Sequence, residues 1–293
     1  MRLRSDLTMD IALATAAALP DLDPDERLLI PALAALGLRA GPAIWTDAAF
    51  DWSCVRACVI RSTWDYIHVR DRYLAWVDRA ARMTSFFNPA PVVRWNSHKR
   101  YLADLEMRGV SVVPTAFVDR GARVDLAELA RARGWKDIVV KPAVSGGSHA
   151  TIRVRGDVDA GAQGHLDTIV PGGDALVQPY FASVEVRGEI SVVFFDGETS
   201  HAIRKNPSLT PAGVKHGGEP RVDATDEERR FARAVLDAIP FDGDELLYAR
   251  VDLARADDGA ITLMELEVVE PSLFLAQGNA ATRFAEAIAK RVR

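Results

Sequence analysis

Near its C-terminus the chain reads Arg250-Val251-Asp252, turns at Asp258-Gly259 and continues as Met264-Glu265-Leu266-Glu267. The Asp-Gly pair between two apolar segments predicts a β-hairpin over residues 247–254 and 260–268. Glu265 and Glu267 are two residues apart, so their side chains share one face of a strand, and Asp252 on the partner strand can join them. Three carboxylates on one face suit a Mg²⁺ that also binds phosphates. Alternate carboxylates are equally typical of a solvated strand face, and the hairpin alone leaves both interpretations open.

The composition excludes several classes of protein. The 293 residues include 48% hydrophobic ones and carry a net charge of -5, so a sizeable core is expected and a broad nucleic-acid-binding face is not. Cys54 and Cys58 cannot form a disulfide framework and predict thiols in a reducing cytoplasm. No apolar segment reaches the roughly 20 residues that span a bilayer, so no membrane association is expected. Residues 1–8 precede Met9, and we expect an extension or a misplaced start there.

The basic residues are split unevenly, because only six of the 36 are lysines. A lysine that is retained among so many arginines is more often present for a specific role, since its ammonium is a compact point charge whereas the guanidinium is a planar fork. Lys99 lies near the start of an expected helix that begins at Asn96 or Ser97 and runs through Arg108. Lys141 ends the apolar strand Val139-Val140-Lys141-Pro142.

Strands and helices alternate over residues 9–90 and predict a parallel α/β unit. Asn88-Pro89-Ala90-Pro91 ends this unit. After it, strands are expected at 110–113, 137–142, 150–155 and 174–179, and a hairpin over 189–196 and 198–204. Helices are expected at 125–134, 225–239 and 279–291. Residues 205–220 have many glycines and prolines without a clear period and predict a mobile loop. Ser145-Gly146-Gly147-Ser148 is a turn of small residues, whose backbone N–H groups can approach an anion closely.

The segment Arg61-Ser62-Thr63-Trp64-Asp65-Tyr66 follows the last strand of the N-terminal unit, where open α/β sheets bind ligands. Arg61 could pair with a substrate carboxylate and Asp65 with its amine, while Ser62 and Thr63 add hydroxyls. The alternative is that Trp64 and Tyr66 are core residues at a seam between domains. Glu270-Pro271-Ser272, just after the acidic hairpin, is a second candidate for recognising an amine.

Taken in order, these segments resemble the ATP-grasp superfamily in its compact, glutathione-synthetase-like form. The matching motifs are Asn96-Ser97-His98-Lys99, Val140-Lys141-Pro142, Ser145-Gly146-Gly147-Ser148, Val177-Gln178-Pro179-Tyr180, Arg250-Val251-Asp252 and Met264-Glu265-Leu266-Glu267. The resemblance implies an α/β fold in three parts. These are an N-terminal parallel α/β pre-grasp domain (1–95), a small lobe (96–180) and a large lobe that carries the metal site (181–293).

The resemblance also implies a role for each motif. Lys99 and Lys141 would contact the phosphates of ATP, and the loop Ser145, Gly146, Gly147, Ser148 would close over them. Gln178 and Tyr180 would hold the adenine and Glu185 the ribose. Asp252, Glu265 and Glu267 would bind two Mg²⁺, for which Mn²⁺ could substitute. Arg204, Lys205 and Arg250 would stabilise the phosphoryl group in transfer. Many relatives have Glu-x-Asn where this chain has Glu265-Leu266-Glu267, which separates it from the D-alanine ligase pattern.

The implied activity is that of an ATP-dependent carboxylate–amine ligase acting on a small amino-acid-like substrate. Phosphorylation would give an acyl phosphate, and an amine would then attack the acyl carbon, with Arg250 stabilising the oxyanion. Three segments are similar to the subgroup that contains the D-cycloserine-forming cyclo-ligase, an enzyme of antibiotic biosynthesis that closes the ring of O-ureido-D-serine. They are Arg61-Ser62-Thr63-Trp64-Asp65-Tyr66, Arg94-Trp95-Asn96 and Glu270-Pro271-Ser272-Leu273-Phe274. The alternatives are a non-catalytic ATP-binding module and a carboxylate kinase or carboxylase. A homo-oligomer is compatible with the sequence.

Overall fold

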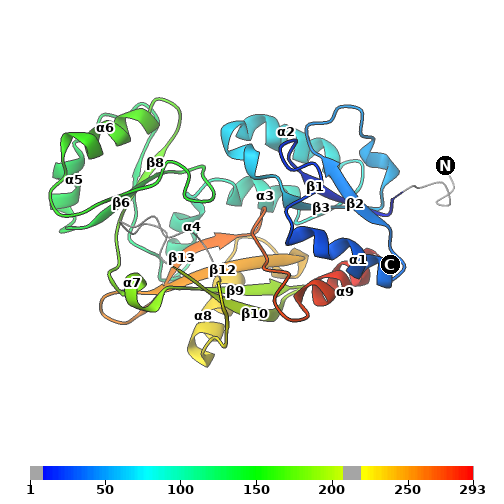
Figure 1. The fold of residues 1–293 in the computed structure, drawn as a ribbon. Helices are drawn as coiled ribbons and strands as arrows, with labels where there is room; N and C mark the ends of the chain where they lie inside the picture. The colour runs from blue at the N-terminus through cyan, green and yellow to red at the C-terminus, as the bar shows by residue number, and fades with distance from the viewer. Residues whose placement is uncertain (1–8, 207–218, 293) are drawn as a thin grey trace.

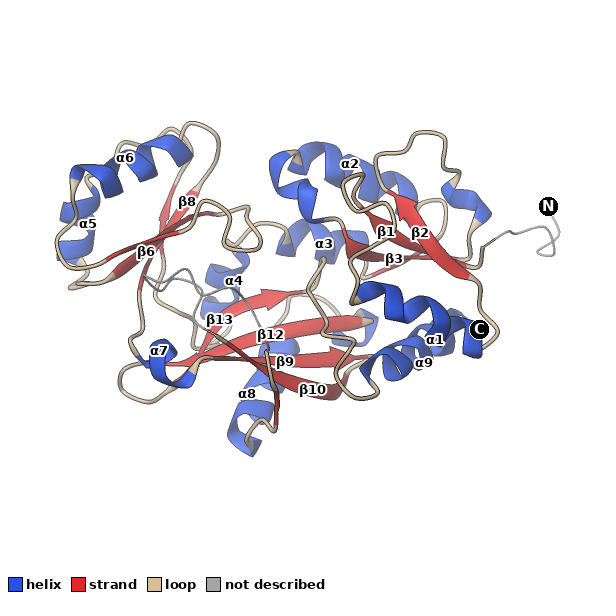
Figure 2. Cartoon of the chain, in the orientation of Figure 1, coloured by secondary structure: helices blue, strands red, loops and turns tan. Residues whose placement is uncertain are grey.

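The computed structural model of the chain describes residues 9–206 and 219–292, and these form three sheets in three parts (Figure 1). The N-terminal α/β part and a smaller lobe lie beside each other above a larger antiparallel sheet (Figure 2). The expected extension at residues 1–8 lies outside the described residues, as does 207–218, which is most of the predicted mobile loop. None of the helices in the described ranges is long and apolar enough to span a bilayer.

The N-terminal part has a parallel sheet in the order β2-β1-β3-β4, which confirms the predicted α/β unit. Its strands are β1 (Ile11–Thr15), β2 (Ala40–Ile44), β3 (Ala57–Ser62) and β4 (Ser85–Phe87). The helical segments are η2 (Glu26–Leu28), α1 (Leu29–Ala35), η3 (Trp52–Cys54), η4 (Trp64–His68) and α2 (Arg70–Ala81). Every residue of β1 and β3 is buried, as expected for parallel strands that are covered on both faces.

The small lobe is an antiparallel sheet in the order β5-β8-β6-β7. Its elements are β5 (Ala116–Val118), α5 (Leu126–Ala132), β6 (Ile138–Pro142), β7 (Ile152–Val154), α6 (Ala160–Ile169) and β8 (Ala175–Pro179). Helix α6 was not predicted from the sequence, because its two glycines weaken the helix propensity of this segment. The helix begins at Asp159, whose carboxylate accepts a hydrogen bond from the Ala162 amide, and Leu166 is buried in the core of the lobe.

The large lobe is a sheet in the order β11-β10-β9-β12-β13, all antiparallel. It contains α7 (Ser183–Arg187), β9 (Glu189–Phe195), β10 (Glu198–Lys205), β11 (Arg221–Val222), α8 (Asp226–Asp237), η5 (Gly243–Glu245), β12 (Tyr248–Arg255), β13 (Ile261–Glu267) and α9 (Ala280–Val292). Both predicted hairpins are confirmed. The predicted helix at 225–239 is also confirmed, and Thr225 and Glu228 form a capping box at its start.

The segment that joins the N-terminal part to the small lobe differs from the prediction. Two short helices, α3 (Ala90–Asn96) and α4 (Tyr101–Met107), replace the single helix expected from Asn96 or Ser97 through Arg108. Asn96 does not cap a helix, because its side chain bridges the backbone of the acidic strand, donating to Leu266 O (2.8 Å) and accepting from Val268 N (2.9 Å). The strand expected at 110–113 is reduced to a bridge between Val112 and Leu263.

The core is shared between parts of the chain that are distant in sequence. One hydrophobic cluster joins β1, α1, β9, β12 and α9, so the N-terminal sheet and the C-terminal helix are packed around common side chains such as Leu33 and Phe284. Helices α1 and α9 lie side by side in Figure 1. This packing holds the N-terminal sheet close to the large sheet.

Candidate active site

A cavity of about 510 Å³ lies where the three parts meet. Its walls come from η4 (Trp64 and Tyr66), the α3–α4 connection, the loop at 145–148 and the face of the large sheet. Five carboxylate residues and three cationic residues line it: Glu189, Glu219, Glu265, Glu267 and Glu270, with Lys99, Lys205 and Arg250. Because carboxylates outnumber cationic side chains, the cavity can bind divalent metal ions. The side chains of Lys99, Lys205 and Arg250 can contact phosphate oxygens.

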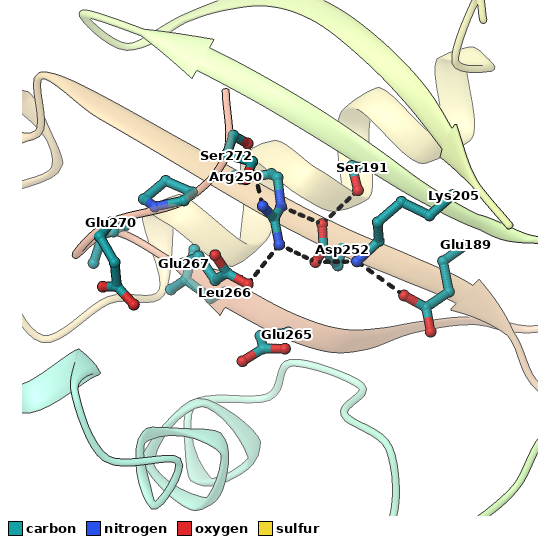
Figure 3. Close-up of polar contacts among 12 residues, drawn as sticks. Glu189, Ser191, Lys205, Arg250, Asp252, Glu265, Leu266, Glu267, Glu270 and Ser272 are labelled. Carbon is teal, nitrogen blue, oxygen red and sulfur yellow. Dashed lines mark hydrogen bonds and ion pairs between the residues drawn. The ribbon is translucent and has the colours of Figure 1, made fainter. Parts of the chain in front are cut away.

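The acidic hairpin forms the floor of the cavity with the predicted geometry. Asp252 on β12 is paired in register with Glu265 on β13, and Arg250 is paired with Glu267. One ligand oxygen from each of Asp252, Glu265 and Glu267 lies within 4.8 Å of the other two (Figure 3). The prediction that the three carboxylates converge on one face is therefore confirmed as geometry, and that they bind metal remains a proposal.

Asp252 is the most enclosed of the three, with no exposed surface. Arg250 donates to both of its oxygens at 2.9 Å, Lys205 Nζ donates at 2.7 Å and Ser191 Oγ at 2.7 Å. Burial alone would raise the pKa of Asp252, but Arg250 and Lys205 hold that pKa well below its usual range. The group is thus an anion at neutral pH, and its full set of donors fixes its orientation.

Lys205 and Arg250 are in turn held by carboxylates of the same face. Lys205 Nζ lies 3.1 Å from Glu189 Oε2, and Arg250 also donates to Glu267 Oε1 and to the Ser272 carbonyl (Figure 3). Burial opposes their charge, but the neighbouring carboxylates raise the pKa of both groups. Both remain cationic, and an anion entering the cavity meets two oriented positive groups.

Lys99 connects the acidic face to the small-residue loop. Its Nζ lies 2.8 Å from Glu265 Oε1 and donates to the Ser145 carbonyl at 2.8 Å. Its position differs from the prediction, because Lys99 lies in the turn between α3 and α4 and not in the first turns of a helix. Burial opposes the ionisation of Glu265, but Lys99 and Lys141 lower its pKa. Burial lowers the pKa of Lys141 itself.

All four residues of the predicted small-residue loop, Ser145, Gly146, Gly147 and Ser148, line the cavity. Gly147 has φ of 55° and Ser148 of 60°, a left-handed conformation that suits glycine at the first of these positions. Ser145 Oγ donates to the Pro142 carbonyl at 3.1 Å, which anchors the loop to the end of β6. The loop therefore lies over the same cavity as Lys99.

Arg204 does not face this cavity. Adjacent residues of a strand point to opposite faces, and Lys205 is the one on the acidic side. Arg204 is exposed and lines a separate hollow with Gly188 and Ile190. The expectation that Arg204 acts on the phosphoryl group with Lys205 is therefore not supported by the structure.

Two of the residues expected to hold adenine and ribose, Tyr180 and Glu185, contact a side chain that was given no role, Arg153. Its guanidinium carbon lies 3.4 Å from the centroid of the Tyr180 ring, and the group pairs with Asp137 (2.8 Å) and with Glu185. Gln178 is buried and donates to Thr115 Oγ1 at 2.9 Å. Gln178, Tyr180 and Glu185 are not among the residues that line the cavity, so their role in binding adenine and ribose remains a prediction.

The segment 61–66 divides into two groups. Trp64 and Tyr66 line the cavity, together with Glu270 and Ser272, so both candidate substrate segments reach it. Arg61, Ser62 and Thr63 have no exposed surface because they lie in and just after the buried strand β3. Asp65 accepts from Trp45 Nε1 at 2.8 Å and is not a lining residue. The expected contacts of Arg61 with a substrate carboxylate and of Asp65 with an amine are therefore not supported.

Glu270 is the carboxylate nearest to the aromatic wall. Burial, with a smaller contribution from the charge of Glu267, raises the pKa of Glu270 to about 8, and a hydrogen bond with Tyr66 opposes this rise. Burial likewise raises the pKa of Glu267 to about 7 in spite of Arg250. A positively charged group placed between them would favour their ionised forms.

Two residues of this site, Glu189 and Ser191, lie in the segment Gly188-Glu189-Ile190-Ser191, to which no role was assigned from the sequence. Glu189 and Ser191 are two apart on β9, so they share the face that carries Asp252, and both contact its hydrogen-bonding network. Their spacing matches that of Glu265 and Glu267 and was the available signal.

The chain is similar to known proteins over nearly its whole length. Residues 11–88 match the family described as the N-terminal domain of D-cycloserine synthetase DcsG. The cycloserine biosynthesis protein DcsG of Streptomyces lavendulae is 36% identical over 295 residues, which cover 97% of this chain and 99% of that protein. The crystal structure of D-cycloserine synthetase DcsG has a TM-score of 0.87 and 34% identity, over 97% of this chain and 99% of that one.

A more distant structure supports the fold alone. The ATP-grasp ligase PsnB, solved with its minimal precursor, Mg and ADP, has a TM-score of 0.63 at 16% identity, over 96% of this chain and 98% of that one. This likeness confirms the predicted ATP-grasp fold, and the two relatives at 36% and 34% identity confirm the predicted ligase class. With a curated relative that matches over nearly its whole length, the chain belongs to the D-cycloserine synthetase family of ATP-grasp ligases.

Proposed function

We propose that this ligase uses ATP to activate the carboxylate of a small amino-acid-like substrate and joins it to an amine, within one molecule when the substrate carries both groups. One observation carries the proposal. One set of cavity residues is Glu265, Glu267, Lys99 and the small-residue loop, with the carboxylate of the buried Asp252 close to those of the two glutamates, and the second set is the wall made of Trp64, Tyr66, Glu270 and Ser272. The first set suits a triphosphate and the second suits a small zwitterion.

The residues present fit magnesium. Asp252, Glu265 and Glu267 supply hard oxygen donors within 4.8 Å of one another, the ligand type that Mg²⁺ prefers. We propose that they hold two Mg²⁺, with Mn²⁺ able to substitute, and the Mg and ADP in the PsnB structure are consistent with this. When bound, the ions would neutralise phosphate charge.

The chain's own residues would do the rest by positioning and charge. Lys99 and the loop at 145–148, which line the cavity, would hold the phosphates. Lys141 on β6, which is not a lining residue but lowers the pKa of Glu265, would assist them, while Glu270 would bind the substrate amine against Trp64 and Tyr66. The substrate carboxylate oxygen would take the γ-phosphoryl group as ADP leaves. The amine nitrogen would then replace phosphate at the acyl carbon, and Arg250, oriented by Asp252, would stabilise the oxyanion.

The test is ADP release by the purified chain with Mg·ATP and pools of amino acids, with O-ureido-D-serine as a separate arm, and with the product masses recorded. We expect ADP together with a product that has lost water relative to the substrates, or a ring-closed product from O-ureido-D-serine. Binding of ATP without ADP release in any pool would instead indicate a non-catalytic module. An acyl phosphate that accumulates regardless of amine would indicate a carboxylate kinase.

Three further assignments stay proposals. The domains are taken as 1–95, 96–180 and 181–293, and limited proteolysis would test these boundaries. A homo-oligomer would be seen by light scattering of the purified protein. We propose a cytoplasmic location because ATP, the proposed substrate, is supplied there.

A further inference from the structure

The segment 270–272 crosses from the acidic strand to the aromatic wall of the cavity, and three different side chains hold its backbone. Each of its three consecutive carbonyls accepts one hydrogen bond: Glu270 O from Trp64 Nε1 (3.0 Å), Pro271 O from Arg61 Nη2 (2.6 Å) and Ser272 O from Arg250 Nη1 (3.2 Å). Two of these donors, Trp64 and Arg250, line the cavity themselves. Arg61 is the third, and it acts from outside the cavity.

Arg61 reaches Pro271 from the interior of the N-terminal part. Its guanidinium is fully buried, with Nε 3.1 Å from Glu26 Oε2 on η2 and the central carbon 4.8 Å from the centroid of the Tyr248 ring. Tyr248 donates its hydroxyl to the Val269 carbonyl at 2.8 Å, one residue before the held segment. The N-terminal sheet, η2 and β12 thus converge on the backbone at 269–271.

The buried pair of Arg61 and Glu26 contributes little to the stability of the fold. Arg61 Nε and Glu26 Oε2 form an ion pair at 3.1 Å without hydrogen-bond geometry, and Arg61 Nη1 has no hydrogen-bond partner among the described residues. An unsatisfied buried polar atom costs about 1–3 kcal/mol. Apolar side chains of similar size would often hold such a core equally well. The contact that explains a guanidinium here is therefore its bond to Pro271 O. Proline has no N–H, so its carbonyl is the only backbone group by which that residue can be held.

We propose that Arg61 is a positioning residue for the ligase reaction: by holding the Pro271 carbonyl it fixes Glu270 and Ser272, whose side chains flank Pro271 and both face the cavity. The role of Glu270 and Ser272 as substrate contacts rests on the proposed function. The clamp on their backbone rests on the contacts alone. Because small displacements of positioned groups reduce rates strongly, loss of the clamp is expected to affect the amino-acid substrate and not ATP.

The principal test is the double variant Arg61→Met/Glu26→Leu, which removes the clamp without leaving a buried charge unpaired. Arg56→Met is the matched control, because Arg56 Nη2 donates to the Val292 carbonyl at 2.6 Å and likewise ties the N-terminal part to the C-terminal helix, away from the cavity. For each variant we would measure Tm, the Kd for ATP, and kcat and KM for the amino-acid substrate, with O-ureido-D-serine as the first probe.

We expect the double variant to melt near the native Tm and to bind ATP within about twofold of wild type, with KM for the amino acid raised at least about tenfold. Arg56→Met should leave that KM unchanged. A folded double variant with native KM would overturn the proposal. So would parallel losses of ATP affinity and substrate affinity, since these would indicate a purely structural role.

Two further measurements keep the proposal decidable. If the double variant does not fold, Arg61→Gln/Glu26→Gln replaces it, because it keeps a neutral polar pair in the interior while the shorter amide of Gln does not reach the Pro271 carbonyl. A raised KM is again expected, and a native KM overturns the clamp. If the wild-type chain makes no ADP with any substrate, the proposed function fails, and hydrogen exchange decides the clamp separately. Exchange at 268–276 should be faster in the Arg61 variant than in Arg56→Met, and equal exchange would overturn it.

Discussion

Replacing Glu265 by Gln tests the metal assignment with little change in shape. Glu265 Oε1 lies 2.8 Å from Lys99 Nζ, and its ligand oxygen lies within 4.8 Å of those of Asp252 and Glu267. The substitution keeps an oxygen at the same position and removes one negative charge from a group of three. The question is whether that charge supports the fold or the binding of Mg·ATP.

The distances predict a small effect on stability. At an effective dielectric constant of about 20, Lys99 attracts the Glu265 charge by about 6 kcal/mol, while each of the two other carboxylates repels it by about 3.5 kcal/mol or more. These opposing interactions nearly cancel, and Lys141 adds some attraction because it also lowers the pKa of Glu265. We therefore expect the free energy of unfolding to fall by less than about 2 kcal/mol. That corresponds to a Tm shift of a few degrees in a chain of this size.

The predicted effect on metal binding is large. A carboxylate oxygen about 2.1 Å from Mg²⁺ attracts it by about 4 kcal/mol even with the screening of bulk water, which is about 10³-fold in affinity. Glu265→Gln should therefore need far more Mg²⁺ for half-maximal ADP release and should make almost no ADP at a few millimolar. The assay is coupled ADP release against Mg²⁺ concentration, with thermal melts on the same samples.

The matched control is Glu198→Gln, an exposed glutamate at the far end of β10 in the same sheet, for which we expect wild-type magnesium dependence. If Glu265→Gln releases ADP at the wild-type rate and magnesium concentration, Glu265 is not a metal ligand and the interpretation of the hairpin is wrong. A loss of activity with a fall in Tm far beyond a few degrees would show instead that the electrostatic balance was misjudged.

Lys141→Arg should weaken ATP binding at least about tenfold, because the larger planar group cannot take the place of a buried point charge; native ATP affinity by calorimetry would contradict this. Lys205→Met should reduce kcat much more than Arg204→Ala, since only Lys205 faces Asp252, and equal losses would contradict the assignment of the two faces. Protonation of His201 is expected to destabilise the fold. Burial, aided by nearby arginines, lowers its pKa from 6.5 to about 4, so the unfolded chain binds more protons in that range. Stability should therefore fall by up to about 3 kcal/mol as the pH drops from 6.5 towards 4, and urea unfolding of His201→Gln should lose part of this acid dependence.

Local patterns predicted the parts of the site that lie on one element or one hairpin. The Asp-Gly turn and the two-residue spacing of Glu265 and Glu267 place three carboxylates on one face wherever that hairpin forms, and the structure has this register. The same rule of alternation was available for Lys205 and Arg204, and it separates them correctly once applied. Lys99, which donates to the Ser145 carbonyl of the small-residue loop, was also singled out from the sequence. The single helix expected around Lys99 is two short helices in the structure.

The sequence by itself thus determined the α/β class, the antiparallel hairpins and the acidic face, because turn chemistry and side-chain periodicity act over a few neighbouring residues. Tertiary structure decided which polar residues reach the cavity. Arg61 has the composition of a ligand-binding residue, yet it is buried beneath segment 270–272 and holds the Pro271 carbonyl across 210 positions of sequence. Arg153 likewise gathers Tyr180 and Glu185 around itself. Such contacts depend on how distant elements pack, and no local period in the chain records them.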